Sequence, residues 1–249
     1  MKLQTMLILG FLIFVLNAVE PQLVSVSENL GNKVSLDLAF HDEKGNRLTL
    51  GSYIDKPTIV LPVYYHCPGS CGTMLSSLST ALNNVPLIPG KDYRVLSLSF
   101  DHEENTENAA TTKNNYFKLL KKGFPEDDWK FLTGDVENIK LFTNSIGYYF
   151  NRVEKHIYEH PNAIVILSKD GTVIRYLYGP SFLPFDIGMA LTEASKGTPS
   201  LSIRKLISYC FSYEPEKRAY AFNLVRYIVI AILLTLGVAM FFLLRKKRK

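Results

Sequence analysis

A pair of cysteines lies where an apolar strand meets a helix, and this junction constrains the fold more than any other segment of the chain. Residues 58–61 form an apolar run typical of a buried strand, and residues 73–82 have the pattern of a helix. Cys67 and Cys71 lie between these two elements, four positions apart. A helix that begins at residue 70 or 71 places both sulfur atoms near its N-terminus. Unpaired backbone N–H groups and the helix dipole favour the thiolate there.

The spacing of the two cysteines leaves three kinds of chemistry open. Thioredoxin-type pairs have two residues between the cysteines, whereas Cys67 and Cys71 have three. Residues four apart on a helix share a face, so the two thiols can still meet. In an oxidising compartment such a pair can form a structural disulfide, act as a redox couple or bind a metal ion. Two thiolates suit the soft ion Cu(I), and an imidazole is the natural third ligand for copper.

The rest of the chain alternates between predicted strands and helices, which indicates an α/β domain. Residues 33–50 have the pattern of a β-hairpin with a glycine in its turn. Further strands are expected at 93–100, 129–133, 162–167 and 172–177, and further helices at 109–121, 136–146 and 185–194.

The two ends of the chain have the composition of targeting and membrane segments. Residues 1–18 contain an eleven-residue apolar run and predict a secretory signal peptide, with an uncleaved anchor as the alternative. A polar connector is expected at 196–219. A transmembrane helix is expected at 220–244, where 18 consecutive residues carry no charge. The basic tail at 245–249 predicts a cytoplasmic C-terminus, which leaves the domain at 19–195 on the opposite side of the membrane.

The net charge of the chain comes from this tail. Lys and Arg number 28 and Asp and Glu number 23, and the tail supplies five of the 28, so the remainder balances at 23 against 23. Because the basic run adjoins a predicted membrane span, it gives no argument for binding nucleic acid. Three cysteines are too few for a disulfide framework. We interpret the third, Cys210, as an inert thiol near the membrane, with lipidation or an intermolecular disulfide as alternatives.

Five histidines are candidates for a third metal ligand. His66 adjoins Cys67, but neighbouring residues in an extended segment point in opposite directions. His160 stands out because it closely precedes the apolar strand expected at 163–167, and the entry to that strand can lie beside the cysteine turn. The other three, interpreted as ordinary surface or loop residues, are His41, His102 and His156.

Residues 65–71, a Cys-Pro-x-x-Cys turn after a strand, resemble the copper-binding loop of the Sco/SenC family. These proteins are thioredoxin-like copper chaperones for the CuA site of cytochrome c oxidase. His160 is similar in position to the distal histidine of the family, and residues 99–106 are similar to its Ser-x-Asp-Pro-x-x-Asp-Thr strand end. The resemblance covers residues 25–195. Gly72 departs from it, since the family often has proline there, and Pro161 resembles the cis-proline of thioredoxins and is expected to be cis.

The resemblance implies that Cys67, Cys71 and His160 bind copper, as Cu(I) or Cu(II), with Asp101 nearby in a supporting role. It implies an α/β, thioredoxin-like domain with an N-terminal β-hairpin, here joined to one C-terminal transmembrane helix. The implied function is that of a metallochaperone rather than an enzyme. Its partner would be the copper-binding subunit of cytochrome c oxidase or another cuproprotein. The expected location is a bacterial inner membrane, with the domain on the periplasmic or extracellular side.

Other functions use the same cysteines. A membrane-anchored thiol–disulfide oxidoreductase would keep the cysteines of a partner reduced and would not need His160. A peroxiredoxin is disfavoured, because Tyr64 stands where that class has threonine. A permanent disulfide between Cys67 and Cys71 would instead indicate an interaction module.

Overall fold

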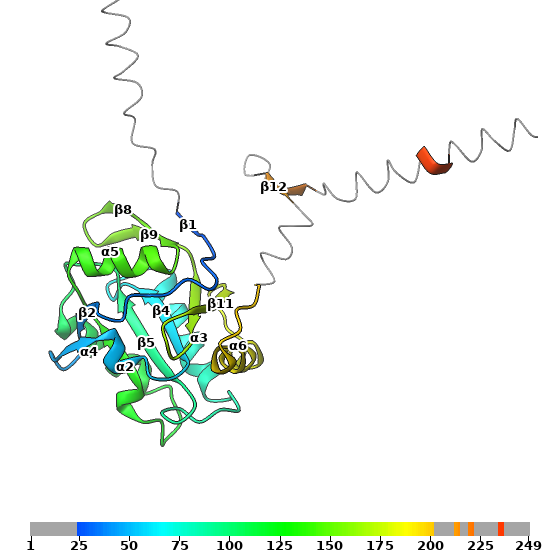
Figure 1. Ribbon diagram of the computed structural model, residues 1–249. Helices are drawn as coiled ribbons and strands as arrows, with labels where there is room; N and C mark the ends of the chain where they lie inside the picture. The colour runs from blue at the N-terminus through cyan, green and yellow to red at the C-terminus, as the bar shows by residue number, and fades with distance from the viewer. Residues whose placement is uncertain (1–23, 202–211, 215–218, 222–233, 237–249) are drawn as a thin grey trace, which may run out of the picture.

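The computed structural model describes residues 24–201, 212–214, 219–221 and 234–236 (Figure 1). The predicted signal peptide at 1–18 and basic tail at 245–249 lie outside these residues, as does Cys210. Most of the predicted connector and transmembrane helix also lies outside them.

A five-stranded mixed sheet forms the centre of the domain, which confirms the predicted α/β class (Figure 1). Its strand order is β11-β10-β4-β5-β6. Strands β4, β5 and β6 are parallel, and β10 runs antiparallel to β4 and to β11. The bounds are β4 Thr58–Val63, β5 Arg94–Ser99, β6 Trp129–Leu132, β10 Ala163–Leu167 and β11 Val173–Tyr178.

Strand β4 lies in the middle of the sheet, and each of its residues is buried. This explains why its sequence is continuously apolar rather than alternating. The strand continues through Pro62 to Val63. Pro62 has no N–H to donate, and the ladder to β10 ends two residues earlier, at the pair Val60–Val165.

Helices α3, α4 and α6 lie side by side, with α3 in contact with both others. Helix α4 begins earlier than predicted, because Asn105 and Asn108 form a capping box at its N-terminus. Helix α6 ends at Gly197, whose φ of 65° is left-handed. The main helices are α3 Ser70–Leu82, α4 Thr106–Phe117, α5 Val136–Ser145 and α6 Pro184–Lys196.

Short elements surround this framework. The predicted hairpin is present, although its paired strands are shorter than the expected 33–50, and it leads into the short helix α2. A second hairpin, β8–β9, was not predicted and lies near α5 (Figure 1). The bounds are β2 Ala39–His41, β3 Arg47–Thr49, α2 Leu50–Tyr53, the 3₁₀ turn η1 Glu126–Asp128, β8 Asn151–Glu154 and β9 Ile157–Glu159.

Strand β1 (Ser25–Val26), at the amino-terminal end of the domain, pairs with β7 (Tyr148–Tyr149). The backbone N–H of Ser27 donates to the carbonyl of Gly147 at 2.8 Å. Gly147 has a φ of 62°, and a Cβ at this position would overlap the Ser27 carbonyl. The left-handed backbone and the close approach of β1 together require glycine here.

The C-terminal segment differs from the predicted single helix where it is described. Strand β12 (Ser212–Glu214) pairs with β13 (Ala219–Ala221), which includes Tyr220, the first residue of the expected helix. Residues 234–236 are helical. In the described part of the chain, every helix is too short or too polar to cross a bilayer.

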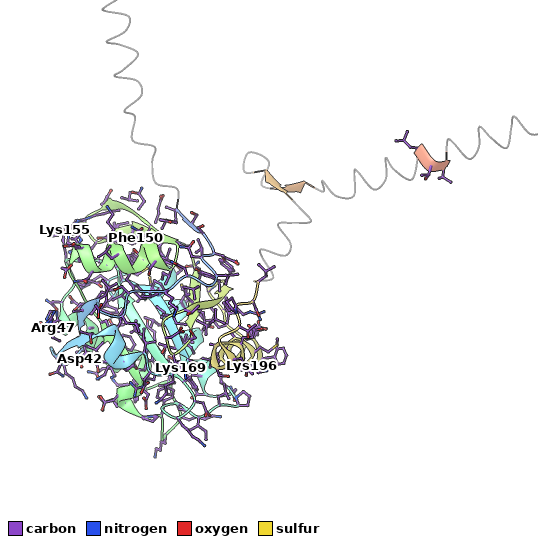
Figure 2. The ribbon with its side chains drawn as sticks, in the orientation of Figure 1. Asp42, Arg47, Phe150, Lys155, Lys169 and Lys196 are labelled. Atoms are coloured by element: carbon purple, nitrogen blue, oxygen red, sulfur yellow. The ribbon has the colours of Figure 1, made fainter. Side chains whose placement is uncertain are left out.

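A buried ion cluster joins the first hairpin to the sheet and to α4. The ammonium of Lys113 on α4 donates to the Glu43 carboxylate at 2.6 Å, and both side chains are 4% exposed. Lys130 on β6 pairs with Asp42 at 3.2 Å, and Asp42, which is labelled in Figure 2, lies in the turn of the first hairpin. The second oxygen of Glu43 accepts from the backbone N–H of Phe131. These contacts fix the hairpin turn against the edge strand of the sheet.

The Glu43→Ala substitution is expected to lower the free energy of unfolding by about 3–5 kcal/mol, because it leaves the buried Lys113 ammonium without its carboxylate. Denaturant titration followed by circular dichroism measures this loss. Lys44→Ala is the matched control, since it removes an exposed ion pair with Asp127 and is expected to cost about 0–1 kcal/mol. Equally small losses in both variants would contradict the role given to the buried cluster.

Candidate metal centre

The direction of the strands brings two distant segments together at one edge of the sheet. Strand β4 ends at Val63 and leads into the cysteine turn, and β10 begins at Ala163, just after His160. Because β10 is antiparallel to β4 and adjacent to it, the start of β10 lies beside the end of β4. His160 therefore lies next to cysteines that are about ninety positions earlier in the chain.

The cysteine turn opens helix α3, as predicted. Gly69 is the N-cap and makes no side-chain capping bond, so the helix N-terminus remains available to the sulfur atoms. The backbone N–H of Gly69 donates to the Cys67 sulfur at 3.3 Å. Cys71, in the first turn, is buried, whereas Cys67 is partly buried. Both are free thiols.

His160 is held so that one ring nitrogen points at the thiols. Its Nδ1 lies 3.1 Å from the Pro161 carbonyl and 3.2 Å from the Tyr148 hydroxyl. A carbonyl only accepts, so this contact requires the proton on Nδ1 and leaves the lone pair on Nε2. Nε2 lies 3.4 Å from the Cys71 sulfur. The rings of Tyr64 and Phe100 pack against the imidazole at 5.7 and 5.4 Å between centroids.

Cys67, Cys71 and His160 form the one group of three or more metal-ligating side chains among the described residues, with donor atoms within 4.8 Å of one another. Two donors that share an ion at bond lengths of about 2.3 Å lie at most about 4.6 Å apart. The three donors are thus within small adjustments of a common ion. The structure brings together all three residues that the sequence nominated.

The two thiols differ in acidity. The pKa of Cys67 lies well below that of a free thiol, mainly because the Cys71 thiol donates a hydrogen bond to its sulfur, with burial opposing and the Tyr64 hydroxyl adding a further hydrogen bond. The pKa of Cys71 is raised, first by burial and then by the neighbouring Cys67 sulfur. At pH values between these two pKa values the pair holds one proton. Cys71 is then the protonated thiol, and the more accessible Cys67 is the thiolate.

A hydrogen bond connects the cysteine turn to the histidine loop. The Ser70 hydroxyl donates to the Asn162 side-chain carbonyl at 2.7 Å, and the Asn162 backbone carbonyl accepts from Gly179. The prediction of a cis peptide bond at Pro161 is wrong, because all described peptide bonds are trans. That expectation rested on the position of Pro161 before a strand, and here the Pro161 carbonyl instead fixes the His160 ring.

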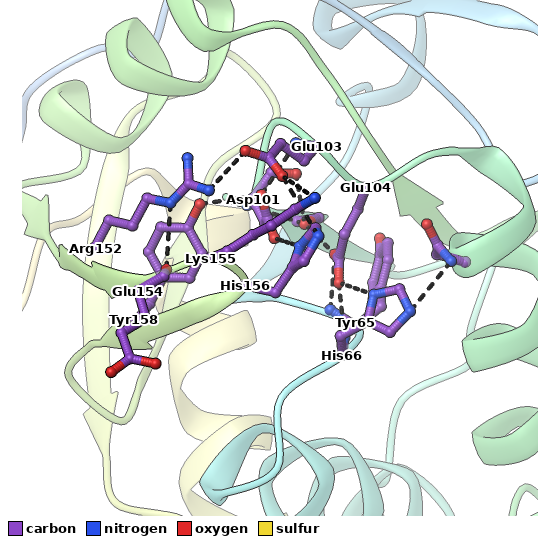
Figure 3. Close-up of polar contacts among 12 residues, drawn as sticks. Tyr65, His66, Asp101, Glu103, Glu104, Arg152, Glu154, Lys155, His156 and Tyr158 are labelled. Carbon is purple, nitrogen blue, oxygen red and sulfur yellow. Dashed lines mark hydrogen bonds and ion pairs between the residues drawn. The ribbon is translucent and has the colours of Figure 1, made fainter.

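Glu104, which the sequence did not nominate, positions the start of the cysteine turn. Its buried carboxylate accepts from the backbone N–H groups of Tyr65 and His66 at 2.8 and 2.7 Å, and from the Ser99 hydroxyl (Figure 3). It also lies 2.9 Å from Nδ1 of His66. The His66 ring is therefore directed away from the thiols, as expected from its place beside Cys67.

Asp101 supports the site through the unpredicted hairpin rather than by contact with the thiols. Its carboxylate binds Nδ1 of His156 at 2.6 Å and the Tyr158 hydroxyl at 3.0 Å (Figure 3). Hydrogen bonds from His156, Tyr158 and the Glu103 backbone outweigh the effect of burial and lower the Asp101 pKa. Tyr158 packs against Tyr64, which packs against His160.

Gly72, a departure from the family pattern, has a local explanation. A Cβ at this position would lie 2.9 Å from the Tyr116 hydroxyl, which comes from α4. Any larger residue at 72 would therefore push Tyr116 away from the first turn of α3.

The fold and site together define a thioredoxin-like α/β domain with a thiol pair at the carboxyl end of its central strand. The chain belongs to the SCO1/SenC family, whose model matches residues 27–182. This range contains the whole central sheet, the cysteine turn and His160.

Several solved structures are similar to this chain over the described domain. A candidate electron transfer protein of Aquifex aeolicus VF5 is 27% identical, with a TM-score of 0.61 over 68% of this chain and 95% of that one. Arabidopsis thaliana ScoI, solved with copper bound, is 19% identical, with a TM-score of 0.53 over 67% and 98%. BsSco, a Sco-family cytochrome c oxidase assembly protein with a disulfide switch, is 19% identical, with a TM-score of 0.54 over 68% and 98%. No curated protein matches the chain.

Iodoacetamide is expected to modify Cys67 at a rate that changes little between about pH 8 and about pH 6. Its lowered pKa keeps Cys67 a thiolate over this range, whereas an ordinary thiol with a pKa of about 8.5 loses roughly tenfold in thiolate per unit of falling pH. Peptide mapping by mass spectrometry of the reduced chain, with Cys210 replaced by serine, measures the rate at each cysteine.

The Cys71→Ala variant is the control for this measurement, because it lacks the thiol that hydrogen-bonds to the Cys67 sulfur. Its alkylation rate should regain the steep pH dependence of an ordinary thiol. Equally steep profiles in the parent and the variant would rule out a thiolate stabilised by Cys71.

Proposed function

We propose that this chain is a copper metallochaperone that binds copper through Cys67, Cys71 and His160 and delivers it to the CuA site of cytochrome c oxidase. The observation that carries the proposal is the convergence of two thiols and one oriented imidazole on a common point. Membership of the SCO1/SenC family supports it, as does the copper bound in Arabidopsis thaliana ScoI.

The donor set suits copper for chemical reasons. Thiolates are soft ligands that favour Cu(I), and imidazole binds both Cu(I) and Cu(II). The hydrogen bonds on Nδ1 of His160 fix the ring before the ion arrives, as hydrogen-bond partners of metal-binding histidines do in established metal sites. The three donors come from two segments that are already adjacent, so little ordering entropy remains to oppose binding.

Delivery by ligand exchange follows from the unequal exposure of the two sulfurs. A partner thiolate reaches the partly buried Cys67 before the buried Cys71. Each incoming sulfur ligand replaces one of this chain, so the ion stays bound to sulfur throughout. Both cysteines must be reduced for loading, which makes copper binding dependent on the redox state of the pair.

The proposed partner is the copper-binding subunit of the oxidase or another cuproprotein, and the proposed location is a bacterial inner membrane. The sequence supports this location through the predicted signal at 1–18 and the uncharged run that precedes the basic tail. The domain would then act on the periplasmic or extracellular side, where it can meet copper sites exposed outside the cytoplasm.

A thiol–disulfide oxidoreductase is the second candidate function. The observation that favours it is the stabilised Cys67 thiolate beside a protonated Cys71, an arrangement suited to attack on a disulfide. The description of the Aquifex aeolicus VF5 protein as a candidate for electron transfer and the disulfide switch of BsSco agree with redox chemistry at this pair. This function makes no use of Nε2 of His160.

His160→Ala is expected to weaken Cu(I) binding at least tenfold while leaving the redox behaviour of the Cys67–Cys71 pair nearly unchanged. The full-length reduced chain is titrated with Cu(I) under anaerobic conditions against a chromophoric competitor. His41→Ala is the control, since His41 is exposed on β2 and should leave the affinity unchanged. A parent chain that takes up no copper but forms a reversible disulfide would refute the chaperone and leave the oxidoreductase.

Tyr148→Phe is expected to reduce copper affinity by about 10–100-fold, because the hydroxyl that orients His160 and its Pro161 carbonyl is lost. The same competition titration measures this effect. Tyr176→Phe removes a hydroxyl that bonds the Ile146 carbonyl, away from His160, and serves as the matched control. Equal affinities in Tyr148→Phe and the parent would show that ring orientation does not limit copper binding.

A further inference from the structure

A cavity of about 300 Å³ lies directly behind His160, outside the thiol site. Its walls come from the end of β5, from helix α5 and from the hairpin β8–β9. Its volume falls at the lower end of the range for ligand pockets in proteins. Phe100, Tyr148, Phe150 and Ile139 give it an apolar interior. Because aromatic rings line it, the cavity suits an aromatic or large aliphatic group.

The cavity shares two walls with the metal centre. The Phe100 ring packs on His160 and also lines the cavity. Tyr148 lines the cavity and places its hydroxyl 3.2 Å from Nδ1 of His160. A group bound in the cavity would therefore be separated from the proposed copper ligand by a single layer of aromatic side chains.

The charged groups of the cavity are all basic. Lys140 and Arg152 line it, and none of its lining residues is acidic. Arg152 is held by Glu103 at 2.6 Å, which neutralises much of its charge. Lys140 is exposed and takes part in no ion pair among residues 24–201. The cavity thus combines an apolar interior with one exposed cation, Lys140, at its rim.

We infer that this cavity is the docking site for an acidic segment of the partner protein, which inserts one aromatic side chain between α5 and the β8–β9 hairpin. The inference rests on the proposed function and specifies the chemistry of its partner. An aromatic anchor in a desolvated pocket supplies the affinity, and carboxylates opposite Lys140 supply orientation and association rate. Docking at this point brings the partner next to His160 at the moment of copper exchange.

The experiment uses the full-length chain in phosphatidylcholine nanodiscs and a fluorescein-labelled acidic heptapeptide with one central phenylalanine. Fluorescence anisotropy measures binding, with empty nanodiscs subtracted. Val136→Trp, at the exposed mouth of the cavity, is expected to weaken binding at least tenfold by blocking entry. Val153→Trp is the matched control, because Val153 is equally exposed but does not line the cavity, and it should bind as the parent does.

Charge variants test the rim. Lys140→Glu is expected to weaken binding of the acidic peptide several-fold and to reduce its dependence on salt. Lys169→Glu makes the same charge change far from Phe150 and the cavity and should have no effect (Figure 2). Peptides with alanine in place of phenylalanine, or with lysine in place of glutamate, should bind at least tenfold more weakly.

Three outcomes would overturn the inference. Equal binding to Val136→Trp and Val153→Trp would place the peptide elsewhere, and equal binding of the lysine peptide would remove the charge argument. Binding of 3-phenylpropionate without binding of the acidic peptide would make the cavity a small-anion site. Copper stoichiometry measured on the same samples separates the two proposals. Copper uptake without peptide binding refutes only this inference, and peptide binding without copper uptake refutes only the chaperone.

Discussion

The antiparallel pairing of β10 with β4 is the constraint on which the rest of the site depends. Strand β4 delivers the cysteine turn to one edge of the sheet, and only an antiparallel neighbour can begin at that same edge. A parallel neighbour would have carried His160 to the opposite end of the sheet. The backbone pairing of the sheet therefore brings two distant segments into contact, whatever conformations their side chains adopt. Glu104 and the Ser70–Asn162 hydrogen bond then adjust the two loops locally.

The two sulfur atoms of the site differ in burial and in protonation, and this difference suits the proposed exchange of copper between ligands. One sulfur is buried and protonated, and the other is accessible and ionised. The imidazole is held from behind by a tyrosine hydroxyl and a carbonyl, so its free nitrogen faces the sulfurs without a search over ring orientations. The same aromatic layer that holds the ring forms the wall of the adjacent cavity. The proposed docking of a partner and the proposed binding of copper thus involve the same side chains, Phe100 and Tyr148.

The sequence alone was enough to predict the parts of the structure that bury apolar surface or contain residues with distinctive chemistry. Strand β4, helix α3 and the three donor residues follow from an apolar run, a cysteine pair and a histidine before a strand. The β8–β9 hairpin was missed because six of its seven strand residues, all but Tyr158, are exposed and give no periodic signal. Glu104 was missed for a related reason. A carboxylate in a loop is usually solvated, and only the backbone N–H groups that converge on it show that it is buried.

The pairing of β1 with β7 links the beginning of the domain to the histidine side of the site. Ser27 lies so close to Gly147 that the two backbones act as one piece, and the next residue is the tyrosine that orients His160. The thiols, by contrast, belong to a helix that β1 does not pair with. A shift of β1 would therefore reach the imidazole through β7 and Tyr148, the residue that follows Gly147. The beginning of the described domain and the imidazole of the site are thus connected through a single pair of strands.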